Sequence, residues 1–401
     1  MNMKNVVWLV PDCYGFLLDE LEALLPHCDR LTVLSAEPIT QAARDRLPQC
    51  VFIHCPERNY WMACLRYPRL RAALKTHGWS RTLRSGWHTH KIAGIYTELL
   101  ELSKQEPIDV VHSHFAHPGG LGGTLLHVPQ IITLRGYDIL TTGDYGSLWN
   151  PFYRKSLIEA CRKGVMVTVG STLSRDAARK LLGPDVQVKL IDGGIICESF
   201  QPARQLSRES LGIPEQAVVL LGVGNLKPLK NFGQLVQALP ALKASTAQPV
   251  RLLLCGDGPD RSRLEQLVVD LNLVDDVRFL GRIERGLLTD AYNFCDILVH
   301  PSYSEGFGNI FLEAFYHHLL VVASPVGVAP DIIRSGGNGF LTELGDQSSL
   351  ESSLIKAILA LPRMAAELEI NRELVRRRFS MEGRVQAYLN CYTEVSEGRC
   401  F

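Results

Sequence analysis

The chain has 401 residues, more than the roughly 250–300 residues at which a single hydrophobic core stops growing, so two domains are expected. Its composition, 46% hydrophobic and 21% charged, excludes a disordered chain, a collagen-like fibre and a coiled coil. The 42 basic and 42 acidic side chains cancel, so no overall field draws the chain to nucleic acid, and an anionic partner must be met by a local patch.

The first half alternates short apolar runs with amphipathic stretches such as residues 16–25 and 92–104. Its first run, residues 6–10, is too short for a signal peptide and predicts a buried strand. The strands predicted in this half are residues 6–10, 31–34, 51–54, 110–112, 130–134, 165–169 and 188–191. Apolar strands that alternate with helices are typical of a parallel sheet covered on both faces. No run of about 18 apolar residues occurs, so no transmembrane helix is predicted.

Residues 57–91 depart from the neutral balance, because Glu57 is their only acidic residue. The basic residues are Arg58, Arg66, Arg69, Arg71, Lys75, Arg81, Arg84 and Lys91, and Tyr60, Trp61, Tyr67, Trp79 and Trp87 lie among them. One interpretation is a solvated helical face above packed aromatic rings. The other is a surface for an anionic acceptor or for membrane head groups, with peripheral contact at the inner face of the membrane. The 11 cysteines form no C-x-x-C pair, which favours buried thiols in a reducing cytoplasm.

The second half repeats the alternation, with helices predicted over residues 232–243 and 261–271 among others. Its predicted strands are residues 218–222, 251–255, 277–280, 297–300, 320–323 and 339–341. The sequence therefore predicts an α/β protein of two doubly wound, Rossmann-like domains with parallel sheets.

The domain boundary is predicted near residues 201–214, which are polar and flanked by prolines. The domains would cover residues 1–200 and 201–379, and a last helix, about residues 380–401, would cross back to the first domain. Because ligands of doubly wound sheets bind outside the carboxyl ends of the strands, the site is expected in a cleft between the domains.

The strongest functional pattern is PSYSEGFGNIFLEAF, residues 301–315, which follows a predicted strand and opens a helix near Asn309. The backbone N–H groups at a helix N-terminus bind phosphate, and glycines allow a diphosphate to approach closely. Glu305 lies beside this anion site and Glu313 just over one turn into the helix, which points to carboxylates that bind sugar and ribose hydroxyls. The alternative is that Glu305 caps the helix and Glu313 is solvated.

Other glycine-bearing strand ends lie at residues 222–230, 254–259 and 277–283. Lys230 stands where a helix begins and could reach a phosphate, or could be a surface cation of that helix. The first segment lacks the third glycine of a dinucleotide-binding fingerprint, because position 227 is Lys. Three such strand ends beside a phosphate-binding helix are hard to explain by packing alone.

Together these residues resemble the retaining nucleotide-sugar glycosyltransferases of family 4, whose GT-B fold has two facing Rossmann-like domains. GVGNLKPLKN resembles the family's G-R-L-x-x-x-K-G element, and Glu305 with Glu313 resembles its E-x7-E motif. In the first half, DVVHSHFAHPGGLGG (109–123) and ITLRGYDI (132–139) resemble elements of members that build polysaccharides. The chain departs from the family at Asn225, where Arg is usual, and at Asn231, where Gly is common.

The resemblance implies a retaining, metal-independent hexosyltransferase without a cofactor. It would move a sugar from a nucleoside diphosphate, UDP rather than GDP, to a hydroxyl of a saccharide or lipid-linked saccharide in surface polysaccharide assembly. Lys230 would neutralise the donor diphosphate, Glu305 would hold hydroxyls of the transferred sugar, and His114 would contact that sugar. The other donor-binding residues implied are Gly224, Asn225, Arg282, Ile283, Gly306, Phe307, Gly308, Asn309 and Glu313. Arg135, Asp138 and His117 would lie on the acceptor side, and Asp138 could alternatively cap the turn that it begins.

A metal site at His112, His114 and His117 is not predicted. Alternate strand residues share a face, so the first two could converge, but no carboxylate or thiol follows at ligand spacing. Four other functions stay open: a retaining glycosidase, a nucleotide-sugar epimerase, a dehydrogenase, and a non-catalytic protein that binds a nucleotide sugar.

Overall fold

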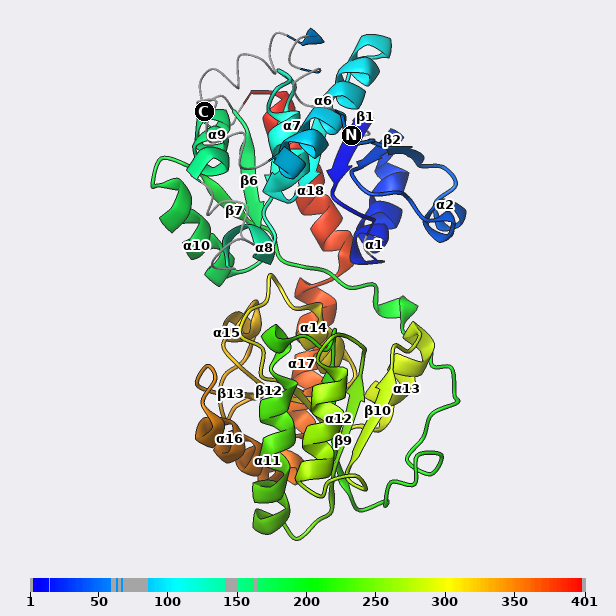
Figure 1. Ribbon diagram of the computed structural model, residues 1–401, viewed down its shortest axis with the longest axis vertical. Coiled ribbons are helices and arrows are strands. Elements are labelled where there is room, and N and C mark those ends of the chain that lie inside the picture. The colour runs from blue at the N-terminus through cyan, green and yellow to red at the C-terminus, as the bar shows by residue number, and fades with distance from the viewer. Residues whose placement is uncertain are drawn as a thin grey trace. The chain divides into compact units, whose positions relative to one another are not determined.

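Each half of the chain folds as a parallel sheet with helices packed against it (Figure 1). The computed structural model describes residues 3–13, 15–58, 63, 66–67, 86–140, 151–161 and 164–398. The chain divides into a first unit, Met1–Asp192 with Met381–Phe401, and a second unit, Gly193–Ser380. The predicted α/β class with two Rossmann-like parallel sheets is confirmed.

The sheet of the first unit has the strand order β3-β2-β1-β4-β5-β6-β7. The strands are β1 (Met3–Val10), β2 (Cys28–Ser35), β3 (Val51–His54), β4 (Val110–His114), β5 (Gln130–Thr133), β6 (Met166–Val169) and β7 (Val188–Leu190). Strand β4 is longer than predicted, because His114 still pairs with Thr133 of β5. His114 is therefore the last residue of the strand and does not follow it.

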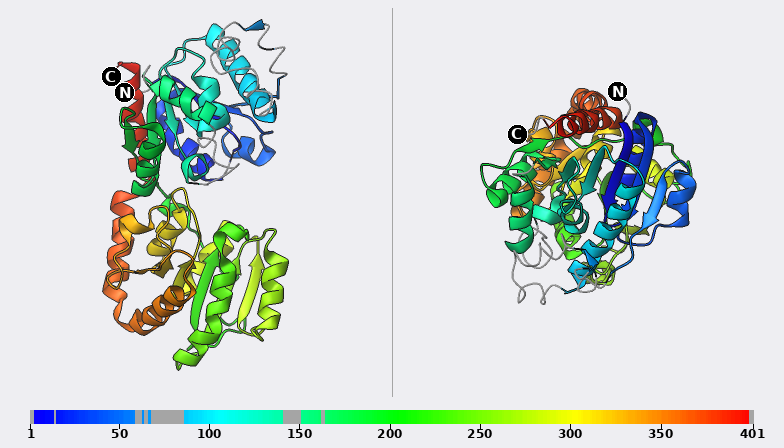
Figure 2. Two further views of the ribbon diagram at one scale, coloured as in Figure 1. Left: turned by 60° about the vertical axis from the view of Figure 1, so that its left-hand side comes forward. Right: turned by 90° about the horizontal axis from the view of Figure 1, so that it is seen from above.

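The helices of the first unit include one from the far end of the chain. They are α1 (Gly15–Leu24), α2 (Gln41–Arg46), α6 (Gly86–Gln105), α7 (Leu121–Gly123), α8 (Gly136–Ile139), α9 (Pro151–Cys161), α10 (Thr172–Leu182) and α18 (Met381–Ser396). Val385, Tyr388 and Tyr392 of α18 are buried in one cluster with Trp8 and Leu17. Figure 2 shows α18, in red, against the first unit, so the predicted helix that crosses back is confirmed.

The sheet of the second unit has the strand order β10-β9-β8-β11-β12-β13. The strands are β8 (Val218–Val223), β9 (Val250–Cys255), β10 (Val277–Gly281), β11 (Ile297–His300), β12 (Leu320–Ala323) and β13 (Phe340–Leu341). The helices are α11 (Phe232–Ser245), α12 (Arg261–Asp270), α13 (Arg285–Phe294), α14 (Asn309–Tyr316), α15 (Ala329–Ile332), α16 (Gln347–Ala360) and α17 (Ala365–Arg378). Val219 and Leu221 enter one core cluster while Val218 and Leu220 enter another, as the two-residue period of a strand requires.

The predicted boundary segment, residues 201–214, lies inside the second unit. The chain joins this unit earlier, because the backbone N–H of Ile195 donates to the carbonyl of Phe379 at 3.0 Å and both side chains are buried in its core. The polar segment is then fixed by Asp290, whose carboxylate accepts from the backbone amides of residues 204, 205 and 206. The segment is therefore fixed along the second unit by these hydrogen bonds.

Candidate active site

The strand order of the second unit reverses between β8 and β11, which pair side by side. Ligands of doubly wound sheets bind outside the carboxyl ends of the strands at such a reversal. Lys230 ends the short 3-10 helix Pro228–Lys230 that follows β8, and Glu305 lies in the loop that follows β11. The topology thus brings together two residues that were predicted separately from the sequence.

Glu305 accepts two hydrogen bonds on one carboxylate oxygen. Lys230 Nζ donates to its Oε1, and His300 Nε2 donates to the same atom at 2.5 Å. The side chains of Glu305 and His300 are 14% and 1% exposed. Burial opposes ionisation of Glu305, but the hydrogen bond and charge of His300 and the charge of Lys230 outweigh it and lower the pKa of Glu305 from 4.5 to about 2. The carboxylate is therefore ionised throughout the physiological pH range.

Gly327 holds the loop of Glu305 in place. A Cβ at Gly327 would lie 2.2 Å from the carbonyl oxygen of Phe307 and 3.0 Å from Cβ of Glu305, and its φ is +58°. The next residue, Val328, donates its N–H to the carbonyl of Phe307 at 2.8 Å. Only glycine allows this close approach, so the segment after β12 fixes the position of the carboxylate.

Helix α14 begins where the sequence predicted, at Asn309, with Gly308 as its N-cap in the left-handed conformation. Among the described residues no side-chain hydrogen bond caps this positive end of the helix, and the loop that carries Glu305 leads directly into it. Glu313, further along α14, accepts a hydrogen bond from the hydroxyl of buried Tyr292 at 2.7 Å. Burial and then the charge of Glu313 raise the pKa of Tyr292 well above its usual range. These pairings do not match the alternative of a capping Glu305 and a solvated Glu313.

Two glycines in the other predicted strand ends are explained by packing, contrary to the sequence-based expectation. A Cβ at Gly256 would lie 1.8 Å from the carbonyl oxygen of Gly224, and one at Gly258 would lie 2.5 Å from that of Leu226. The loops after β8 and β9 therefore need glycines in order to touch, whatever ligand binds there. Asn225 is exposed beside this contact.

The predicted base-binding residues Arg282 and Ile283 directly follow β10. Arg282 is exposed, and Ile283 is half-buried against the core of the second unit. Strand β10 lies two positions from β8 in the sheet. Arg282 and Ile283 therefore lie at the same carboxyl edge of the sheet as Lys230, but not next to Lys230.

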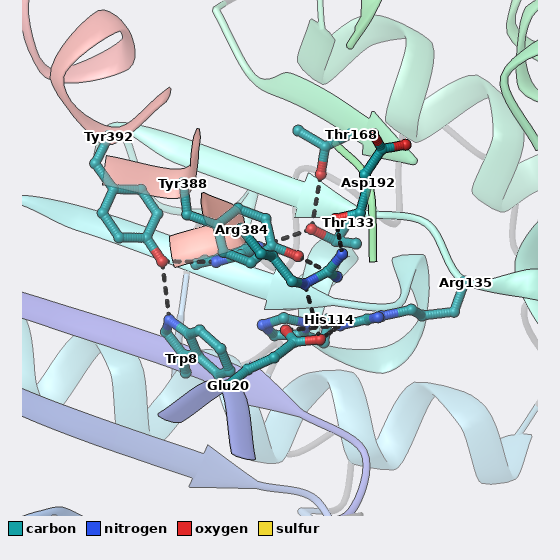
Figure 3. A network of polar contacts seen from close by, with 11 residues as sticks. Trp8, Glu20, His114, Thr133, Arg135, Thr168, Asp192, Arg384, Tyr388 and Tyr392 are labelled. Atoms are coloured by element: carbon teal, nitrogen blue, oxygen red, sulfur yellow. Dashed lines mark hydrogen bonds and ion pairs between the residues drawn. The ribbon is translucent and has the colours of Figure 1, made fainter. Parts of the chain in front are cut away.

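In the first unit, His114 and Arg135 are in direct contact (Figure 3). Arg135 Nη2 lies 2.7 Å from Nδ1 of His114, and the same nitrogen bonds the carboxylate of Glu20 at 3.2 and 3.1 Å. Asp138 accepts the backbone N–H groups of Ala116 at 3.0 Å and of Arg135 at 2.8 Å. The structure thus gives Asp138 the capping role, while its role as an acceptor contact stays a prediction.

The other two histidines of this segment are His112 and His117. His112 is fully buried, and its ring nitrogens bond the hydroxyls of Tyr392 at 2.7 Å and Thr133 at 2.8 Å. His117 is half-buried in the turn Ala116–Gly120. Within the part of the chain that the structure describes, no group of three or more His, Cys, Asp or Glu side chains could hold a metal ion.

Comparison with known proteins decides the family. Residues 203–373 match the family model described as Glycosyl transferases group 1. The chain is 31% identical over 324 residues to the D-inositol 3-phosphate glycosyltransferase of Geodermatophilus obscurus, an alignment that covers 75% of this chain and 70% of that protein. The chain belongs to the glycosyltransferase group 1 family.

Two further proteins resemble this glycosyltransferase. It is 27% identical over 307 residues to the N-acetyl-alpha-D-glucosaminyl L-malate synthase of Bacillus anthracis, covering 75% of this chain and 78% of that protein. The crystal structure of HepE from Anabaena, in complex with UDP and glucose, matches with a TM-score of 0.74 at 20% identity and covers 98% of this chain and 100% of that chain. The structural likeness confirms the predicted GT-B fold.

Sequence reasoning missed several side chains that organise the glycosyltransferase site. His300 lies in the apolar strand β11 and resembles a core residue in the sequence, and Tyr292 on α13 has no motif around it. Glu20 lies in the predicted first helix, but its partner Arg384 lies on α18 at the other end of the chain, so no local pattern links the two residues. For His300, the one available signal was its place directly before the predicted anion loop.

Most of the basic and aromatic segment 57–91 lies outside the described residues. Of its described members, Arg58 pairs with Glu98 at 3.0 Å, and Lys91 is buried and pairs with Glu37. In the described part of the glycosyltransferase, every helix is too short or too polar to cross a membrane. Contact with an anionic acceptor or with membrane head groups stays a prediction.

Proposed function

We propose that this glycosyltransferase transfers a sugar from a UDP-sugar to an acceptor hydroxyl with retention of configuration and without a metal ion. The observation that carries the proposal is the pairing of Lys230 with Glu305 where the sheet order reverses, beside the positive end of α14. An ammonium group and a helix N-terminus suit a diphosphate, and an ionised carboxylate suits sugar hydroxyls. The donor is proposed as UDP-linked because the structurally similar HepE binds UDP and glucose.

In this proposal Lys230 serves two partners. Its ammonium group has three donors, so it can keep the bond to Glu305 and also bind a phosphate oxygen. As the bond between the anomeric carbon and the diphosphate breaks, negative charge grows on the leaving oxygen. Lys230 and the amides of Gly306 to Asn309 would stabilise that charge without reorganising, an effect worth several kcal/mol in enzymes.

The acceptor oxygen would form its bond to the anomeric carbon on the face that the diphosphate leaves. The acceptor proton would pass to the departing diphosphate oxygen, so the step needs no protein nucleophile. Glu305 fits this scheme because Lys230 and His300 both bond its Oε1, and its other carboxylate oxygen would accept hydrogen bonds from sugar hydroxyls. Glu313, held by Tyr292, would bind the ribose hydroxyls.

The acceptor is proposed to be a saccharide or lipid-linked saccharide. This part rests on the resemblance of residues 109–123 and 132–139 to members that build polysaccharides. His114 from the first of these segments would contact the donor sugar, and Arg135 and His117 would lie toward the acceptor.

The test is a panel of UDP- and GDP-sugars, with release of the nucleoside diphosphate measured with and without saccharide acceptors. We expect one UDP-sugar to be consumed, and Lys230→Met and Glu305→Gln each to lower turnover at least about 100-fold, the loss expected for removing one group that stabilises the transition state. Lys243→Met is the matched control, because Lys243 is also ion-paired but lies at the opposite end of α11. Turnover near the wild-type rate in either site variant would contradict the proposed site, and conversion of the donor to its epimer without an acceptor would contradict the transfer reaction.

A further inference from the structure

His114 is a buried histidine that uses only one of its two ring nitrogens in hydrogen bonds with the described residues. Its side chain is fully buried, with the ring of Trp8 at 4.0 Å and the ring of His112 at 4.3 Å between centroids. Nδ1 lies 2.7 Å from Nη2 of Arg135. Nε2 is also buried and has no hydrogen-bond partner among the described residues.

The bond to Arg135 decides where the proton of His114 lies. A guanidinium group carries only donors and stays protonated in proteins, so Nδ1 of His114 must accept this hydrogen bond. A neutral imidazole that accepts at Nδ1 carries its proton on Nε2. Burial, with the charges of His112, Arg135 and Arg384, holds the pKa of His114 well below its usual range, which favours this neutral form.

Arg135 is itself held in place, through Glu20, by a network of polar contacts that reaches α18 (Figure 3). Its Nη2 bonds Glu20, whose Oε1 also lies 3.1 Å from Nε of buried Arg384 on α18. Arg384 is anchored in turn by the carbonyl of Asp192 and the hydroxyl of Tyr388, each at 2.6 Å. The ring of Phe16 packs against the guanidinium of Arg135, 5.0 Å from its central carbon. The group that bonds His114 therefore cannot turn away without breaking ion pairs in a buried setting.

His112 provides an internal comparison, since it lies on the same face of β4 and is equally buried. Both of its nitrogens bond hydroxyl groups, of Tyr392 and Thr133, which can donate or accept. His112 is thus satisfied by the fold, whereas His114 keeps one buried N–H group without a partner in the described chain. Leaving such a donor unpaired costs free energy, so a bound ligand that accepts from it would recover that cost.

We propose that Arg135 is a positioning residue that fixes His114 as a neutral imidazole with its proton on Nε2, so that His114 donates a hydrogen bond to an oxygen of the bound sugar and does not act as a base. The tautomer of His114 is a property of the protein alone. The hydrogen bond to a sugar rests on the proposed function, because it needs a sugar at Nε2. Arg135 then acts through His114, and its place toward the acceptor stays a separate prediction.

The first experiment reads the tautomer directly. The full chain is labelled with ¹⁵N-histidine, and two-bond correlations between ring nitrogens and ring protons are recorded at pH 7, with the His114 signals assigned from a His114→Gln variant. We expect Nε2 protonated and Nδ1 unprotonated. In Arg135→Met, which removes the donor, we expect a mixture of tautomers of the neutral ring, and in Arg135→Lys, which keeps a donor, the wild-type pattern. A proton on Nδ1 in the wild type, or a charged ring, would overturn the proposal without any variant.

The second experiment measures kcat and KM against pH with the donor found in the panel. Arg135→Met should lower kcat/KM about tenfold, the factor for one lost hydrogen bond, without a new limb near neutral pH because His114 stays buried, while Arg135→Lys should recover most of the rate. Arg46→Met is the matched control, because Arg46 also pairs with acidic residues of α1, but these are Asp19 and Glu22 and not the Glu20 that Arg135 bonds. An unchanged spectrum and an unchanged kcat/KM in Arg135→Met would overturn the positioning role. If the tautomer is as stated but no sugar nucleotide reacts, the proposed function fails and the sugar contact with it, while the role of Arg135 in fixing the proton stands.

Discussion

At Glu305, two hydrogen-bond donors oppose the effect of burial on one carboxylate. Its pKa in the folded protein, about 2, is below its ordinary value of 4.5, so its contribution to stability is fully present above pH 4.5 and is lost as the pH falls through 2. A shift of this size corresponds to a contribution on the order of 3 kcal/mol to the free energy of unfolding. We therefore expect Glu305→Gln to be destabilised relative to wild type at pH 7, and the difference to shrink by roughly half or more at pH 3.

Denaturant unfolding of the two proteins at both pH values measures this difference. Glu343→Gln is a suitable control, because Glu343 is exposed and its substitution should change the unfolding free energy by less than about 0.5 kcal/mol. A gap between wild type and Glu305→Gln that is equal at pH 7 and pH 3 would mean that the paired carboxylate does not stabilise the second unit.

Among the connecting segments, the turn between β12 and α15 supports the proposed donor site through Gly327. Alanine there would combine a left-handed backbone, at about 1–2 kcal/mol, with a Cβ only 2.2 Å from the carbonyl oxygen of Phe307. We expect Gly327→Ala to lower the free energy of unfolding by more than about 2 kcal/mol and to weaken donor binding, because the loop of Glu305 has to move. Gly336→Ala is the matched comparison, since Gly336 has φ +77° but open space around its Cβ position, so only the backbone cost remains. Calorimetric titration with UDP and denaturant unfolding distinguish the two variants, and equal effects would show that the contact with Phe307 is unimportant.

The strands and helices, and the half of the candidate site formed by Lys230 and Glu305, were predictable because the patterns that indicate them are local in the sequence. Apolar runs at strand spacing located β8 and β11, and the rule that parallel strands end at one edge brought Lys230 near Glu305. Side chains joined over long distances carry no such signal. Trp8 and Tyr392, bonded through the indole N–H, are 384 positions apart. The glycines at the strand ends show a different limit of sequence-based prediction. Gly256 is needed where two loops touch, and a glycine in the sequence does not tell whether packing or ligand binding requires it.

For the molecule as a whole, the core of the first unit depends on α18, which comes from the far end of the chain. Tyr388 and Tyr392 are fully buried there, and Arg384 balances Glu20. We expect a chain that stops after Ser380 to expose the apolar cluster around Trp8 and Leu17 and to lose the ordered first unit, while the second unit keeps its fold.

Hydrogen exchange followed by peptide analysis reports both units in one experiment. A chain that stops after Ser396 keeps all of α18 and should protect β1 and α1 as the full chain does. Equal protection in the shorter chain would show that α18 is dispensable.

The path of the chain also sets the order in which the protein can mature on the ribosome. The second unit is continuous from Gly193 to Ser380, so it can close as soon as its last residue leaves the exit tunnel. The first unit, although synthesised earlier, waits for Met381–Ser396 to emerge before its core is complete. During that interval its apolar faces are open to chaperones or to aggregation. Nascent chains arrested before and after this segment emerges should therefore differ in protease resistance of the first unit alone, with the unit translated first being the one that finishes last.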